Sequence, residues 1–142
     1  MQVEFIKRLP DPDEIKEQHP LPASLVKLKR ERDAEISAVI KGESDKFLVI
    51  IGPCSADNED AVCDYVTRLA SINDKVKDKV ILIPRIYTNK PRTTGAGYKG
   101  MLHQPDPDKK PDMMAGVIAV RKMHIRAMQE SDKRPRSYCE SS

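Results

Sequence analysis

The sequence predicts an α/β fold built on a parallel sheet. The run Phe47–Ile51 is continuously apolar and rich in β-branched residues, which is typical of a strand buried on both faces of such a sheet, and Val80–Ile83 is a second apolar strand. Apolar residues at helical spacing separate these runs and recur after the second one, over 113–129. The order strand, helix, strand, helix is that of successive βα units.

The first forty residues precede this pattern and differ from it. Val3 and Phe5 alternate with polar residues and predict an edge strand, and the prolines that follow predict an irregular arm. Over 22–41, apolar residues recur at helical spacing among charges and Gly42 follows, so we expect an amphipathic helix. Residues 1–42 are therefore expected to form an N-terminal arm and helix.

Residues 43–130 are expected to hold the βα units. Asp57 and Asp60 predict a capping box at the start of the helix between the strands. Its apolar face is expected to consist of Val62, Tyr65, Val66 and Leu69. After Glu130 the periodicity stops, and we expect the polar segment 131–142 to be disordered.

Composition excludes several classes of protein. The chain has 142 residues, within the range of one domain, but 33% are charged and 4% aromatic, which predicts a thin core. Its 25 basic and 22 acidic residues are interspersed, unlike the basic stripe of a nucleic-acid-binding protein. No apolar run approaches the roughly 20 residues of a membrane span. Three cysteines without a signal-peptide pattern predict a reduced, cytoplasmic protein.

Cys54 follows the first strand within Gly52-Pro53-Cys54-Ser55. A helix begins just after it and would favour a thiolate, so Cys54 is a candidate metal ligand or reactive thiol. The alternative is a small buried apolar residue, which is the commoner role of a free cysteine. Cys63, expected on the polar side of its helix, and Cys139 share no metal-like spacing with Cys54 and are expected to be incidental.

Arg85 follows the second strand directly, at the edge where ligands bind in α/β folds. The loop that continues from it contains Lys90 and Arg92 around a proline, then Thr93 and two glycines that let the backbone approach a ligand. These groups suit phosphate and carboxylate oxygens, and the alternative is a solvated basic loop. The spacing of a Walker phosphate loop is absent.

Other candidate residues have simpler interpretations. We expect His103 to be a solvent-exposed turn residue and His124 to be packed against the core. The residues expected to fill gaps in the core are Met113, Met114, Met123 and Met128.

The segments Ile51–Ser55 and Pro84–Gly100, with the spacing between them, resemble the class I 3-deoxy-7-phosphoheptulonate synthases, also called phospho-2-dehydro-3-deoxyheptonate aldolases. The resemblance extends over about Met1–Gln129. It implies a TIM barrel and a transferase that condenses phosphoenolpyruvate with erythrose 4-phosphate on the route to chorismate and the aromatic amino acids. It also implies a divalent metal ion and a homo-oligomer, with contacts and feedback control served by the N-terminal arm.

The resemblance assigns a role to each candidate residue of the site. Cys54 would be a metal ligand, and Arg85 would contact phosphoenolpyruvate. Lys90 would be the catalytic residue, which holds that substrate and helps to move protons at the reacting centre. Arg92 and Thr93 would bind the phosphate of the aldose.

The sequence pattern predicts fewer strands than a TIM barrel contains, since a TIM barrel needs about 250 residues and eight strands. We therefore expect a partial barrel limited to the first two βα units. The chain would be a truncated or frame-shifted product that lacks the other metal ligands. When isolated, it is expected to be inactive and to be molten or to aggregate. Two alternatives are a non-catalytic module that associates with intact synthase subunits and a separate phosphate-binding domain.

Overall fold

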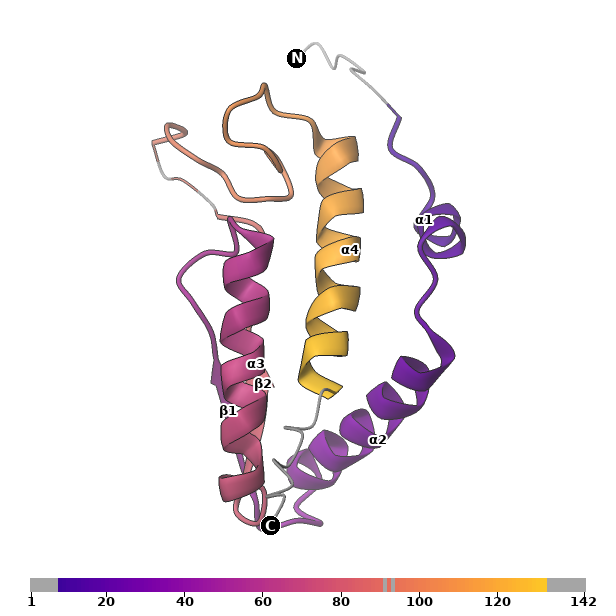
Figure 1. Cartoon of the computed structure of the whole chain (residues 1–142), viewed down its shortest axis with the longest axis vertical. Coiled ribbons are helices and arrows are strands. Elements are labelled where there is room, and N and C mark those ends of the chain that lie inside the picture. The colour runs from indigo at the N-terminus through magenta and orange to yellow at the C-terminus, as the bar shows by residue number, and fades with distance from the viewer. Residues whose placement is uncertain (1–7, 91, 93, 133–142) are drawn as a thin grey trace, which may run out of the picture.

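A computed structural model describes residues 8–90, 92 and 94–132 of the chain. These residues form four helices and two strands (Figure 1). In chain order the elements are α1 (Pro12–Gln18), α2 (Ala23–Ile40), β1 (Phe47–Ile51), α3 (Glu59–Val76), β2 (Val80–Pro84) and α4 (Met113–Asp132). The predicted α/β class and the order of the βα units are confirmed.

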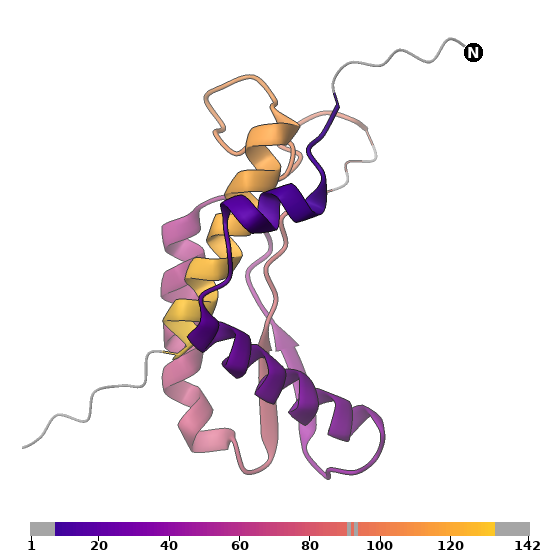
Figure 2. The same cartoon turned by 90° about the vertical axis from the view of Figure 1, so that its right-hand side faces the viewer.

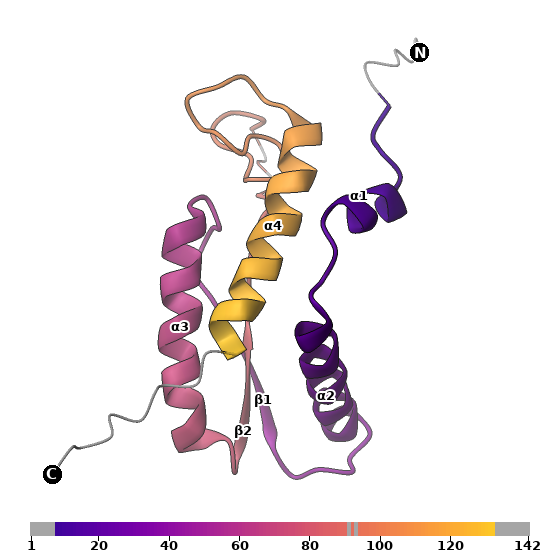
Figure 3. The same ribbon diagram turned by 45° about the vertical axis from the view of Figure 1, so that its right-hand side comes forward.

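β1 and β2 pair in parallel, with Phe47 opposite Val80 and Ile51 opposite Pro84. α3 packs against β2 and against α4, and α4 lies between α3 and the two N-terminal helices (Figures 1 and 3). The loop that leads from β2 to α4 lies at the end of the molecule to which both strands point (Figure 2). This arrangement brings the carboxyl ends of both strands next to that loop.

The core lies between α3, α4 and the segments that follow the strands. Its buried members are Ala56, Val62, Val66, Met101, Met123 and Ala127. Met123 is completely buried, as predicted for a core methionine. Met114 and Met128 are half-buried, whereas Met113 is 39% exposed, so the prediction that Met113 fills the core is wrong. Met113 begins α4, ahead of the part of that helix that packs on α3.

The prediction that β1 is buried on both faces is wrong. The exposed fraction is 73% for Phe47 and 66% for Ile50, and Val49 and Ile51 are also exposed. The reason is that, among the described residues, β1 has one neighbouring strand and α3 packs on β2. Ile81 of β2 is 7% exposed, so the helical layer covers one strand and leaves the other open.

The N-terminal arm is more regular than predicted. The predicted strand at Val3 and Phe5 lies outside the described residues. The prediction of an irregular arm after it is wrong, because Pro12–Gln18 forms the helix α1. Asp11 and Glu14 form a capping box that stabilises the amino end of α1, and the proline that follows Asp11 suits the first position of a helix. A helix of seven residues can therefore form there. The predicted helix over 22–41 is confirmed as α2.

Three details of the later helices also differ from prediction. The side chain that caps α3 is Asn58, which accepts a hydrogen bond from Ala61 N, and not Asp57. Cys63 is buried against α4 instead of lying on a polar face, and this burial raises the pKa of its thiol. α4 continues through Asp132, so helix replaces the first two residues of the predicted tail, whose remainder, 133–142, lies outside the described residues.

None of the helices in the described part of the chain has the length and apolar character that crossing a bilayer would require.

Candidate active site

The chain segments that follow β1 and β2 remain side by side beyond the strands. Arg85 N donates to Ile51 O at 2.9 Å, and Ala56 N donates to Tyr87 O at 2.9 Å. Gly52 makes this approach possible, because a Cβ atom there would lie 2.0 Å from the Arg85 carbonyl oxygen. Residues 52–56 and 85–87 therefore form the base of a site at the carboxyl edge of the sheet.

Cys54 and Lys90 meet on this base. The ammonium group of Lys90 donates to the Cys54 sulfur at 3.2 Å across 36 residues of sequence. Cys54 is exposed, so the alternative that it is a buried apolar residue is wrong. The structure thus brings together two residues that sequence reasoning placed in one site from separate strand ends.

Arg85 lies beside this pair. Its Nη2 atom donates to the carbonyl oxygen of Pro53, the residue before Cys54, at 2.8 Å. Its guanidinium carbon lies 5.1 Å from the centroid of the Tyr87 ring, a cation–π contact. Sequence reasoning did not single out Tyr87, although an aromatic residue two positions after a strand-end arginine is a readable signal. Arg85 is therefore held on the Cys54 side of the site.

The loop that carries Lys90 is closed by backbone hydrogen bonds. Lys90 N donates to Lys99 O at 2.8 Å, and Leu102 N donates to Thr88 O at 3.1 Å. Gly100 has a positive φ of 99°, and a Cβ atom there would lie 2.4 Å from Thr88 O. Only glycine fits this position, and the close contact holds the backbone at Lys90 in place.

Arg92 is farther along the same loop and faces its own backbone. Its Nε atom donates to Tyr98 O at 3.0 Å, and its side chain is exposed. No described contact joins it to Cys54 or Arg85. Thr93, the other residue expected to bind the aldose phosphate, lies outside the described residues.

Two hydroxyl groups close to the site are buried without a hydrogen-bond partner among the described residues, those of Ser55 and Tyr98. Burial, with a smaller contribution from Asp57, raises the pKa of the Tyr98 hydroxyl, so it remains protonated at neutral pH. Sequence reasoning missed Tyr98, because a tyrosine in a glycine-rich loop gives no signal of burial. Buried hydroxyl groups without a hydrogen-bond partner are uncommon in folded proteins.

His103 and His124 both have structural contacts. His103 is half-buried and its Nε2 atom lies 3.2 Å from Asn89 Oδ1, so the prediction of a solvent-exposed residue is wrong. The loop folds back on itself there, which covers the ring. His124 is half-buried, and its Nδ1 atom donates to Val120 O at 2.8 Å, as expected of a packed histidine.

The described residues do not form a metal site by themselves. They contain no group of three or more histidine, cysteine and carboxylate side chains close enough to hold one ion. A catalytic metal centre needs about three protein ligands and an open position. Cys54 could supply one ligand, from an exposed position at the edge of the sheet.

Comparison with known proteins identifies the family. Residues 18–125, which include every residue assigned to the site, match the DAHP synthetase I family. The chain belongs to the DAHP synthetase I family. This confirms the resemblance to 3-deoxy-7-phosphoheptulonate synthases that the strand-end motifs indicated.

Members of this family from several organisms are similar to the chain over most of its length. The Phe-sensitive phospho-2-dehydro-3-deoxyheptonate aldolase of Escherichia coli K12 is 32% identical over 87% of the chain, and the phenylalanine-inhibited enzyme of Saccharomyces cerevisiae is 35% identical over 65%. The solved phospho-2-dehydro-3-deoxyheptonate aldolase of Francisella tularensis SCHU S4 matches 92% of the chain with a TM-score of 0.82 and 27% identity. The chain spans 35%, 25% and 38% of these three proteins, respectively.

Proposed function

We propose that the chain carries the first part of the active site of a cytoplasmic 3-deoxy-7-phosphoheptulonate synthase. The reaction joins phosphoenolpyruvate to erythrose 4-phosphate in the biosynthesis of aromatic amino acids. The observation that supports this most strongly is the contact of Lys90 with Cys54, beside Arg85, at the carboxyl ends of two parallel strands. These residues lie within the part of the chain that matches the family.

Arg85 would bind the carboxylate or phosphate of phosphoenolpyruvate. A guanidinium group has five N–H donors, and the bond to Pro53 O uses one, so donors remain for a ligand. Because the Tyr87 ring and the Pro53 carbonyl already hold the side chain, less conformational entropy is lost when it binds an anion. Charge-assisted, bidentate bonds from arginine to such oxygens are stronger than neutral ones.

Lys90 would hold the same substrate from the other side and carry the proton at Nζ. Its ammonium group is a compact charge whose position is fixed by the Cys54 sulfur and by the backbone bond to Lys99. A cation fixed in advance next to the reacting carbon stabilises the negative charge that develops during condensation. Arg92, with Thr93, would hold the phosphate of the aldose, at the tip of the loop.

A divalent metal ion does not fit the described residues as a complete site, because no three histidine, cysteine or carboxylate side chains among them lie close enough to hold one ion. Arg85 would supply positive charge and Lys90 would supply positive charge and a proton, and neither role depends on the metal ion. Cys54 is proposed as one of the ligands of a larger centre.

We also propose a place for these elements in a larger fold. β1 with α3 and β2 with α4 would be the first two units of a (β/α)8 barrel, because functional side chains follow both strands at the same edge, as in barrel enzymes. Residues 1–42 would form an arm for oligomer contacts and residues 43–130 the barrel units. The hydrogen bond from Arg121 of α4 to the His19 carbonyl, 3.1 Å long, fastens that arm to the barrel unit.

Calorimetric titration of the 142-residue chain with phosphoenolpyruvate would test this proposal. We expect binding that Arg85→Ala or Lys90→Ala weakens at least about tenfold, since each removes a charge-assisted bond. Arg68→Ala is the matched control, because Arg68 is an exposed arginine paired with Asp64 on α3, away from the site. Absence of binding, or equal loss in the control, would contradict the proposal. Condensation is expected to be absent in the isolated chain.

A further inference from the structure

Residues 99–103, the clamp segment, lie against the backbone that carries Lys90. Lys90 N donates to Lys99 O at 2.8 Å, and Leu102 N donates to Thr88 O at 3.1 Å. The two bonds hold the two successive peptide groups that precede the Lys90 side chain. The position of the clamp segment therefore sets the position of this side chain.

A side chain of the clamp segment makes a third contact with the same stretch of backbone. The Nε2 atom of His103 lies 3.2 Å from Oδ1 of Asn89, the residue before Lys90. Because an amide oxygen can only accept, the Nε2 atom carries the hydrogen and donates it. The backbone of His103 is held as well, since its N atom donates to Gly100 O at 3.1 Å and its O atom accepts from Asp112 N at 3.0 Å. Asp112 directly precedes α4, so His103 links the Lys90 backbone to the start of that helix.

α4 supports the clamp segment by direct contact between the two backbones. Gly116, in the first turn of α4, is buried. A Cβ atom there would lie 1.8 Å from the carbonyl oxygen of Leu102 and 3.0 Å from that of Met101, so only glycine lets the helix and the segment touch. Met101 is 4% exposed and belongs to the same core cluster as Met123 of α4, which holds the segment in this position.

We propose that Gly116 and His103 are positioning residues for Lys90. Gly116 lets α4 contact the clamp segment, and His103 joins that segment to Asn89. Together they keep the Lys90 ammonium group at the Cys54 sulfur, 3.2 Å away. A lysine side chain has a flexible four-carbon stem, so its charge stays in one place only when its backbone is held. This inference rests on the proposed role of Lys90 in binding phosphoenolpyruvate.

The substitution Gly116→Ala measures how much this support matters. The added methyl group would begin 1.8 Å from Leu102 O, whereas ordinary contacts of a Cβ atom lie at 3.4–4 Å. The helix and the clamp segment must therefore move apart by more than about 1 Å, a displacement that is large for a group that binds or reacts.

The contact of Lys90 with Cys54 can be measured without any substrate. o-Phthalaldehyde joins one primary amine and one thiol into a fluorescent isoindole with loss of two water molecules, and within a protein the two groups must be neighbours. We expect the 142-residue chain to form an isoindole between Lys90 and Cys54. Lys90→Ala and Cys54→Ser should both lose it, and mass spectrometry of the peptides identifies the joined residues.

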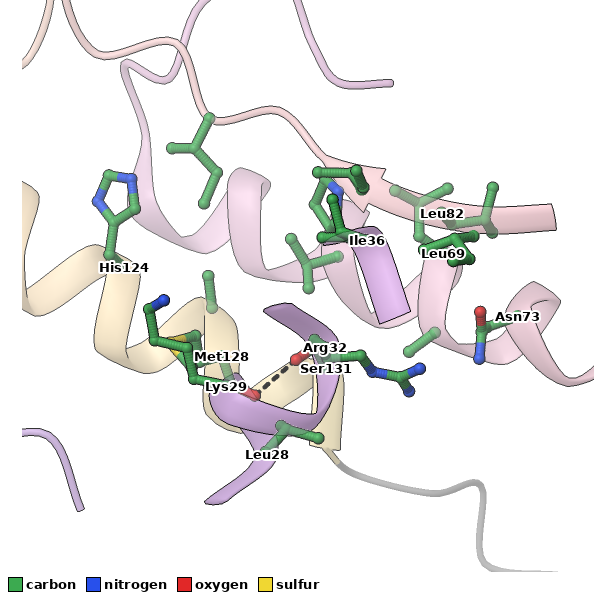
Figure 4. A pocket seen from close by; sticks show the side chains of 17 residues that line it. Leu28, Lys29, Arg32, Ile36, Leu69, Asn73, Leu82, His124, Met128 and Ser131 are labelled. Atoms are coloured by element: carbon green, nitrogen blue, oxygen red, sulfur yellow. Dashed lines mark hydrogen bonds between the residues drawn. The ribbon is translucent and has the colours of Figure 1, made fainter. Parts of the chain in front are cut away.

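Gly116→Ala should slow formation of this isoindole at least about tenfold and weaken phosphoenolpyruvate binding by a similar factor, because Lys90 moves with the clamp segment. Met128→Ala is the matched control. Met128 lies farther along the same helix, at a cavity of about 310 Å³ between α2, α3, α4 and β2 (Figure 4). Its truncation loosens the packing of α4 away from the clamp segment, so it should change neither quantity. Circular dichroism shows whether both variants retain their helices.

Should Gly116→Ala fail to fold, His103 provides the test. His103→Ala removes the bond to Asn89 and should reduce the rate of isoindole formation and the affinity for phosphoenolpyruvate about fivefold, the effect of one neutral hydrogen bond. His103→Gln places an N–H donor near the former position of Nε2 and should restore both. This rescue separates positioning from a general loss of structure, which would affect the two variants alike.

The proposal would be overturned by a chain that forms no isoindole between Lys90 and Cys54, or by unchanged rates in the folded Gly116→Ala and His103→Ala variants. Equal losses in Met128→Ala, or no rescue by His103→Gln, would also overturn it. If the unaltered chain forms the isoindole but binds no phosphoenolpyruvate, the proposed function fails. The isoindole rates then still decide whether Gly116 and His103 position Lys90.

Discussion

β1 and β2 have nearly the same composition and opposite surroundings. Each has five apolar residues in parallel register, yet Phe47 of β1 is 73% exposed and Ile81 of β2 is 7% exposed. The difference is that α3 packs on β2 and the described chain places no comparable helix on β1. An apolar run therefore predicts a strand, whereas burial depends on which other elements reach it.

The largest effect on stability is expected when a charge is introduced into each strand. Ile81→Lys should destabilise the fold by at least about 4 kcal/mol, because it buries an unpaired ammonium group. Phe47→Lys should change the free energy of unfolding by less than about 1 kcal/mol, since its side chain already lies in water. Urea unfolding followed by circular dichroism measures both. Equal losses would show that β1 is covered in solution.

A smaller effect is expected where the two strands end. Gly52→Ala would place a Cβ atom 2.0 Å from Arg85 O, so the backbones must separate, at a cost of about 1–3 kcal/mol. Gly95→Ala measures backbone strain without a steric clash, because Gly95 has a positive φ, which Gly52 lacks, and no atom lies within 4 Å of its added Cβ. Gly52→Ala should in addition weaken phosphoenolpyruvate binding, which calorimetry would detect. Unchanged binding in a destabilised variant would separate the site from the strand contact.

The smallest effect is expected from chemical modification, which compares the alkylation rates of two cysteines. Cys54 is exposed and should react quickly with iodoacetamide, whereas Cys63 is buried against α4 and should react only when the chain opens. Burial raises the pKa of the Cys63 thiol, so its contribution to stability is complete below the pKa of an unfolded cysteine and is lost as pH rises above it. Protection of Cys63 should therefore decrease above about pH 9. Mass spectrometry of the two peptides follows this, and equal rates at pH 7 would contradict the packing of α3 on α4.

Much of the site could be predicted from the sequence, because it depends on where strands end. Cys54 and Arg85 each follow an apolar run, and parallel strands bring their carboxyl ends to one edge, so proximity follows from topology. The contact of Lys90 with Cys54 required in addition a loop closed at Gly100. Tyr98 could not be found in this way, since its burial depends on the folded loop.

Local patterns in the sequence were sufficient to predict the types and order of the central elements, the α2 helix, the strand-end residues and the family. Periodicity and turn residues are local, and they act within a few residues of each position. Only the folded structure shows that, among the described residues, most β1 side chains are exposed, that Cys63 is buried and that a cavity of about 310 Å³ lies against β2. These properties depend on contacts between segments far apart in the chain, and no local pattern specifies such contacts.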